Sequence, residues 1–126
     1  MGVTLARSFI IIEPDPIVCL DMEGMLTTRY PQSDVIAGAS LSDIGHAIHT
    51  CGPDSTLFIK SALFSEDEAL LRVTRSAVTR GGQVVIIGHS VEVDFAATFV
   101  ELPFTTGMIM AALDRDTPDS TVGPAV

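Results

Sequence analysis

The sequence is short of cysteine, of basic residues and of long hydrophobic runs. Its two cysteines, Cys19 and Cys51, are too few for a disulfide framework, so the chain is expected in a reducing compartment, the cytoplasm. Seven Lys and Arg against 16 Asp and Glu give a net charge of −9, which argues against a nucleic-acid partner. No apolar run approaches the roughly 18–20 residues that span a bilayer, and the N-terminus lacks the pattern of a secretory signal. A membrane partner is therefore not expected either.

The composition that remains is typical of one compact domain. The chain has 126 residues, of which 47% are hydrophobic and 18% are charged. This length is enough to bury a core without disulfides or structural metal. Residues 1–115 are predicted to form the domain, and residues 116–126 a flexible C-terminal tail.

Five apolar segments alternate with segments of helical periodicity. The strands are predicted at residues 8–12, 34–38, 56–62, 83–88 and 97–101. This alternation implies an α/β fold of βαβ units, with a parallel sheet covered on both faces. Only a short stretch, residues 88–96, links the last two strands, whereas a parallel crossover usually takes about a dozen residues or more. The fourth helix is therefore predicted to be shortened to about one turn, or replaced by a loop.

Helix starts are predicted from side chains that can accept a hydrogen bond from a free backbone N–H. Asp15, followed by a proline, is expected to cap the first helix. Ser40 with Asp43 and Ser65 with Glu68 have the spacing of capping boxes before the second and third helices.

The two ends of this pattern resemble the receiver domain of two-component response regulators. Residues 8–26, SFIIIEPDPIVCLDMEGML, read as a strand, an acidic turn and a helix. Residues 97–115, ATFVELPFTTGMIMAALDR, read as a strand, a Leu-Pro-Phe turn and a helix. The resemblance implies a CheY-like, flavodoxin-like (βα)5 fold with sheet order 2-1-3-4-5. In that fold the active site lies at the carboxyl ends of the strands.

In the family, the resemblance implies, an Asp after the third strand accepts a phosphoryl group. Two acids after the first strand hold Mg²⁺, and a Ser or Thr after the fourth strand and a Lys after the fifth contact the phosphoryl oxygens. Phosphoryl transfer needs these groups because it requires a nucleophilic carboxylate, a hard cation and donors for the developing charge.

Most of these positions hold other residues in this chain. Glu13 matches the first acid, but Pro14 stands in place of the second. Asp15 comes one position later, where capping of the first helix is its expected role. The fifth-strand lysine is replaced by Leu102, although Pro103 after it matches the family.

The acceptor position has no acid in any plausible register. It falls on Ile59, Lys60 or Ser61, and no Asp or Glu occurs from residue 55 to residue 65. The Ser or Thr position falls on Gly88 or on the residue before it. The resemblance therefore implies a degenerate receiver with no catalytic residue, no metal and no cofactor.

Lys60 suggests a replacement for the lost chemistry. A lysine near the old acceptor site could pair with Glu13 and supply the positive charge that Mg²⁺ supplies in relatives. The alternative is that Lys60 points into solvent at the end of its strand.

Three apolar residues at the C-terminal helix indicate an interface. Phe104 matches the family pattern, and Met108 and Met110 lie in a run of large apolar residues that cannot all face one core. One of the two methionines is expected to be exposed or covered by a partner, which makes a homodimer through this helix plausible. A metal site at His46, His49 and Cys51 is considered but disfavoured. Surface and helix-end histidines with a small buried thiol are the expected interpretation.

The function expected from these features is that of a stand-alone, atypical receiver-like module in phosphorelay signalling. It would act by binding a signalling protein and would not be an enzyme. The alternative is a small flavodoxin-like ligand-binding protein or enzyme, with Glu13, Asp15, Lys60, Ser61 and His89 in its pocket. A further alternative is an active receiver in which another acid accepts the phosphoryl group.

Overall fold

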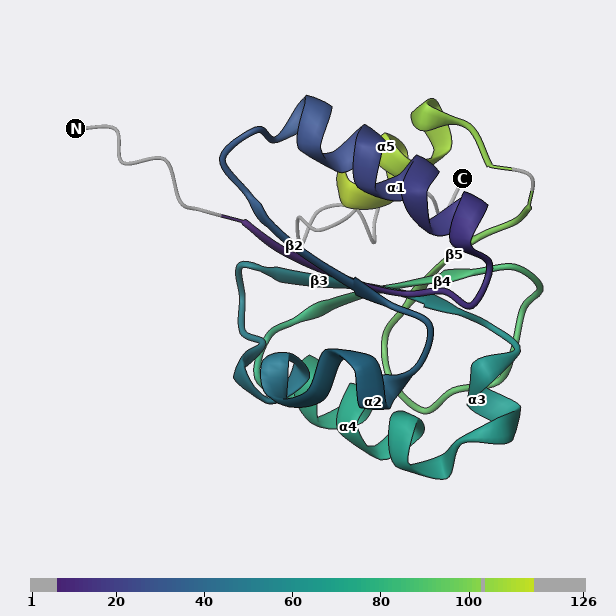
Figure 1. Ribbon diagram of the computed structural model, residues 1–126. Helices are drawn as coiled ribbons and strands as arrows, with labels where there is room; N and C mark the ends of the chain where they lie inside the picture. The colour runs from purple at the N-terminus through teal and green to yellow at the C-terminus, as the bar shows by residue number, and fades with distance from the viewer. Residues whose placement is uncertain (1–6, 103, 115–126) are drawn as a thin grey trace, which may run out of the picture.

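A computed structural model describes residues 7–102 and 104–114. Its centre is a five-stranded parallel sheet of order β2-β1-β3-β4-β5, as predicted (Figure 1). The strands are β1 (Ser8–Ile12), β2 (Asp34–Gly38), β3 (Ser55–Lys60), β4 (Gln83–Ile87) and β5 (Thr98–Val100). The helices are α1 (Pro16–Arg29), α2 (Leu41–Ile44), the 3₁₀ helix η1 (Gly45–Thr50), α3 (Leu63–Glu66), α4 (Glu68–Thr79) and α5 (Thr106–Asp114).

Two hydrophobic cores form because both faces of the sheet are covered. Side chains alternate across a strand, so Ile10 and Ile12 of β1 enter one core while Phe9 and Ile11 enter the other. Helices α1 and α5 cover the upper face in Figure 1, and α2, α3 and α4 cover the lower face. The continuous isoleucine run of β1 is fully buried for this reason.

The start of α1 follows the sequence signals. Asp15 Oδ1 accepts a hydrogen bond from the N–H of Ile17 at 2.9 Å, and Pro16 holds the first helical position. The predicted cap of the first helix is confirmed.

The other two predicted capping boxes are wrong. The side chain of Ser40 makes no capping bond, and Asp43 instead accepts from the N–H of Ala39. Asp67, which was not predicted, caps α4 by accepting from the N–H of Leu70. Ser65 lies inside the short helix α3, which the sequence pattern had not separated from α4.

The predicted second helix is also divided, because α2 ends at its C-cap residue, Gly45, and the chain continues as the 3₁₀ helix η1. This glycine has φ of 54°, a backbone conformation that side-chain-bearing residues rarely adopt. Its 3₁₀ continuation η1 still buries Ile48, as the sequence predicted. The guanidinium of Arg80 donates to the carbonyls of Ile48 and Cys51, both at 2.9 Å, and so ties the end of η1 to α4.

Residues 89–97, here called the strap, contain no helix. Nine helical residues would span about 13 Å, whereas the return along the five residues of β4 takes about 17 Å. An extended chain covers that distance. The side chains of Val91, Val93, Phe95 and Ala97 pack against the lower core, and the residues between them are exposed. The predicted shortening of the fourth helix is thus a complete replacement by an extended segment.

Within the described residues, no helix is both long and apolar enough to cross a bilayer. The predicted tail, residues 116–126, lies outside the described part of the chain.

The strap is expected to contribute to stability through Phe95, whose ring centroid lies 6.2 Å from that of Phe64. Phe95→Ala should lower the free energy of unfolding by about 1–3 kcal/mol, less than for a fully buried phenylalanine because Phe95 is only half-buried. Urea unfolding measures this change. The outward-facing neighbour provides the control, since Glu92→Ala should change stability by no more than about 0.5 kcal/mol. Equal effects of the two substitutions would show that the strap is not packed.

Candidate functional site

The carboxyl ends of β1, β3 and β4 meet at one edge of the sheet. Their register pairs Ile12 with Ile59 and Lys60 with Ile87. The residue after β1, Glu13, therefore lies beside the end of β3. This is the edge at which open parallel α/β sheets generally place their sites.

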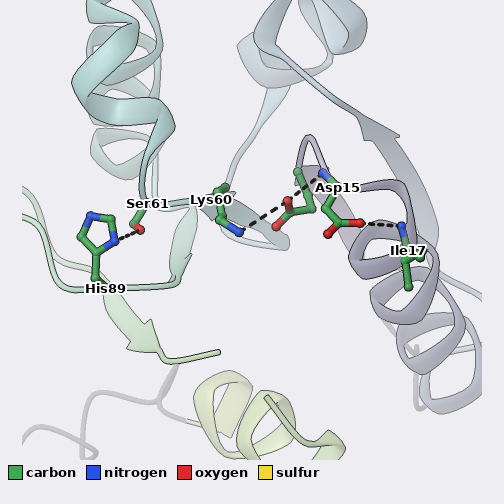
Figure 2. A network of polar contacts seen from close by, with 6 residues as sticks. Asp15, Ile17, Lys60, Ser61 and His89 are labelled. Carbon is green, nitrogen blue, oxygen red and sulfur yellow. Dashed lines mark hydrogen bonds and ion pairs between the residues drawn. The ribbon is translucent and has the colours of Figure 1, made fainter. Parts of the chain in front are cut away.

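Glu13 is a buried acid at the centre of this edge. The residue is only 3% exposed. Its Oε2 accepts a hydrogen bond from the N–H of Asp15 at 2.9 Å, and lies 3.8 Å from Lys60 Nζ (Figure 2). Its Oε1 is buried and has no hydrogen-bond partner among the described residues.

Of the two alternatives for Lys60, the ion pair with Glu13 is the one that the structure contains. The distance of 3.8 Å is too long for a direct hydrogen bond, so the attraction is electrostatic. The side chain of Lys60 is 26% exposed, so it is only partly removed from solvent. The site therefore supplies one positive charge to Glu13 from the chain itself.

Pro14 and Asp15, the other two residues compared with the family's metal-binding acids, lie outside the buried site. Pro14 and Asp15 are both exposed. The carboxylate of Asp15 is directed toward the first turn of α1, where it caps the helix (Figure 2). Glu13 is the acid of the β1–α1 turn that is buried beside β3.

The three candidates for the acceptor position, Ile59, Lys60 and Ser61, have different surroundings in the structure. Ile59 is fully buried in the lower core and is not part of the site surface. Lys60 faces Glu13. Ser61 is fully buried, and its Oγ lies 3.2 Å from Nδ1 of His89 (Figure 2).

The contact between Ser61 and His89 closes the site beside β4. The N–H of Ser61 donates to the carbonyl of Ile87 at 2.8 Å. Gly88 follows with φ of 122°, and a Cβ added to it would lie 2.6 Å from Ser61 Oγ. Only glycine fits here without displacement. Ser61 and His89 were both expected in the alternative pocket, but their contact was not predicted, because the Gly-His-Ser sequence gives no signal for it.

A surface hollow of about 330 Å³ opens next to Lys60. It is lined by Lys60, Gly88, His89, Glu101 and Leu102. Leu102, which is 39% exposed, places an apolar side chain where a receiver would use a cation. The hollow thus combines a lysine and a histidine with an opposing carboxylate. Pro103 lies outside the described residues.

The three apolar residues predicted at an interface belong partly to the core. Phe104, Met108 and Met110 are each half-buried and pack against the upper core. Neither methionine is fully exposed, because both pack against the edge of the upper core.

The cysteines and histidines do not assemble a metal site. No cluster of three or more His, Cys, Asp or Glu side chains is found among residues 7–102 and 104–114. Burial raises the pKa of the Cys51 thiol. Burial, followed by the charges of Glu23 and Glu13, raises the pKa of Cys19. Both cysteines are free thiols.

Removing the charge of Lys60 should destabilise the fold. Lys60→Met leaves the buried Glu13 carboxylate without a counter-charge, and should lower the free energy of unfolding by about 1–3 kcal/mol. The expected loss of stability is smaller than that for breaking a fully buried ion pair, because Lys60 is partly exposed. Chemical denaturation measures it. The double variant Glu13→Gln with Lys60→Met should recover most of the loss; equal stability of Lys60→Met and the parent chain would contradict the pairing.

A side chain at position 88 should strain the backbone and collide with Ser61. Gly88→Ala is expected to lower the free energy of unfolding by about 1–3 kcal/mol because of its φ of 122°. Adding Ser61→Ala removes the nearest colliding atom but not the backbone strain. Thermal unfolding of the single and double variants should therefore show partial rescue. Complete rescue would place the whole effect in the side-chain contact.

Comparison with known structures agrees with this architecture. A response regulator receiver domain protein from Bacillus halodurans C-125 superposes with a TM-score of 0.68 at 18% identity, covering 90% of this chain and 99% of that one. A response regulator receiver protein from Dyadobacter fermentans DSM 18053 superposes with a TM-score of 0.61 at 16% identity, covering 88% and 98% of the two chains. No family model and no curated protein matches the sequence. The chain has the CheY-like receiver fold of response regulators, as the resemblance of its two ends predicted.

Proposed function

We propose that this protein is a receiver-like signalling module that acts by binding another protein and does not accept a phosphoryl group. The observation that supports this most directly is the position of Lys60. Its ammonium lies 3.8 Å from Glu13 at the end of the third strand, where the receiver reaction requires an acid. The sequence has no Asp or Glu between residues 55 and 65.

The charges at the strand ends favour a site that is permanently neutralised. Phosphoryl transfer to a carboxylate depends on a nucleophilic acid, a divalent cation and donors that stabilise the developing charge. Here Lys60 supplies one positive charge, Pro14 offers no side-chain oxygen, and Leu102 offers no donor. In this proposal Lys60 does permanently what a bound cation does transiently.

What the module retains is a scaffold with exposed surfaces. A signalling protein of complementary shape is the proposed partner, and self-association through Phe104, Met108 and Met110 of the α5 region is the form suggested by the sequence. The net charge of −9 disfavours nucleic acid as the partner. The two free thiols are compatible with the cytoplasm as its compartment.

A second candidate function is supported by the hollow next to Lys60. Its lysine and histidine could bind a small anion, although Glu101 opposes this. A thermal-shift screen with small carboxylates and nucleotides tests it, and a large, saturable rise in melting temperature would favour ligand binding over a purely scaffolding role.

Incubation with Mg²⁺ and acetyl phosphate should leave the protein unmodified. The expected result is an intact mass without an added phosphoryl group, under conditions in which an active receiver domain run in parallel is labelled. An adduct that maps by proteolysis to any Asp or Glu of this chain would contradict the proposal. Adduct formation by Lys60→Asp alone would show that the scaffold is competent and that residue 60 blocks the reaction.

A further inference from the structure

The outer edge of β5 has an unpaired backbone. β5 is the last strand of the sheet and pairs only with β4 among the described residues. The carbonyl of Val100 accepts from the N–H of Gly88 at 2.8 Å, so the polar groups of Val100 face β4. Because these groups alternate in direction along a strand, the N–H and C=O of Phe99 face outward. A free edge of this kind is a template for another strand.

The position of β5 at the end of the strand order leaves this edge without a neighbouring strand among the described residues. The side chain of Val100 is buried in the upper core, so that of Phe99 points to the opposite face of the sheet. On that face the strap packs through Val91, Val93, Phe95 and Ala97, but Phe99 remains 39% exposed. A large aromatic side chain and an open backbone therefore lie at the same position.

A hollow of about 370 Å³ follows the same edge. All three residues of β5 line it, together with Glu101 and, on α5, Met108, Ala111 and Ala112. The two alanines have small side chains and occupy little of the hollow. The side chain of Met108, which is apolar and flexible, also lines it. An apolar side chain from an added strand would fit between β5 and α5.

The charge of this edge selects a basic partner. Glu101 is exposed, lines the hollow and has no ion-pair partner among the described residues. No Lys or Arg lines the hollow. A second copy of the chain would bring another acidic edge and a further net charge of −9, which disfavours self-pairing here.

We propose that the outer edge of β5 binds an extended, basic segment of a partner protein as a sixth strand. Backbone hydrogen bonds to Phe99 would hold the segment, an apolar side chain would enter the hollow, and a Lys or Arg would face Glu101. This is strand addition, in which backbone bonds give affinity and pockets for alternate side chains give specificity. The inference rests on the proposed function as a binding module and specifies the chemistry of its partner.

The test uses a fluorescein-labelled heptapeptide of alternating valine and lysine, with binding followed by fluorescence anisotropy. Phe99→Pro removes the outward N–H without touching the bonds to β4, and should weaken binding about tenfold or more. Phe99→Ala keeps that N–H and should have a smaller effect. Glu101→Lys should weaken binding about two- to fivefold, and less at high salt. Ile36→Ala is the matched control, since Ile36 is 40% exposed on β2 at the other edge of the sheet, and should change affinity less than about twofold.

Two further peptides separate strand addition from general attraction between opposite charges. The same peptide with alternate backbone amides methylated, and an alternating valine–glutamate peptide, should both fail to bind. Equal binding of the methylated peptide, no binding of the parent peptide, or unchanged binding to Phe99→Pro would each overturn the inference. Circular dichroism confirms that each variant is folded, and Glu101→Lys tests the edge without altering the backbone.

Sedimentation of the chain without peptide tests whether a second copy of the chain occupies the edge. A dimer that Phe99→Pro dissociates would show that a second copy occupies the edge, and would overturn the choice of a basic partner. None of these results bears on phosphorylation, which intact mass measures separately. Failure of the strand-addition inference is thus distinguishable from failure of the proposed function.

Discussion

The buried carboxylate of Glu13 is the constraint on which the strand-end site depends. Removing a charged carboxylate from water costs several kcal/mol unless a counter-charge and hydrogen bonds replace the lost hydration. The N–H of Asp15 provides one hydrogen bond and Lys60 the counter-charge. The turn after β1 and the end of β3 are therefore coupled, and neither Glu13 nor Lys60 can change alone without cost.

A second constraint is the length of the link between β4 and β5. Nine residues cannot form a helix and also return to the start of the next parallel strand. The chain solves this with an extended strap whose alternate side chains cover the lower core. On the same face Phe99 of β5, the last strand of the sheet, remains 39% exposed.

Features set by local sequence were predictable. The bounds of β1 and β2 and the cap of α1 by Asp15 follow from apolar periodicity and cap chemistry. The order of the strands was implied by the resemblance to receiver domains. The caps at Ser40 and Ser65 were not predicted correctly, because Asp43 and Asp67 offer competing acceptors a few residues away. The loss of a full fourth helix was predicted from the short connection, but the extended packing of the strap was not, although Val91, Val93 and Phe95 have a period of two.

Contacts in the site could be anticipated from the sequence only where the register of neighbouring strands brings two residues together. The pair of Glu13 and Lys60 follows from two residues at the ends of neighbouring strands. The contact between Ser61 and His89 depends on how the chain leaves β4 at Gly88, which a single sequence does not specify. The burial of Phe104, Met108 and Met110 depends on how α5 rests on the sheet, so periodicity alone could not assign their exposure.

In the proposed function, Lys60 supplies the charge that a cation would otherwise bring to Glu13. A titration of the isotope-labelled protein with MgCl₂, followed by amide NMR, tests this most directly. We expect no saturable shift at the amides of Glu13, Asp15 and Lys60 in the parent chain, and a saturable shift at Glu13 once Lys60→Ala has removed the ammonium. Saturable magnesium binding at Glu13 in the parent chain would contradict the account.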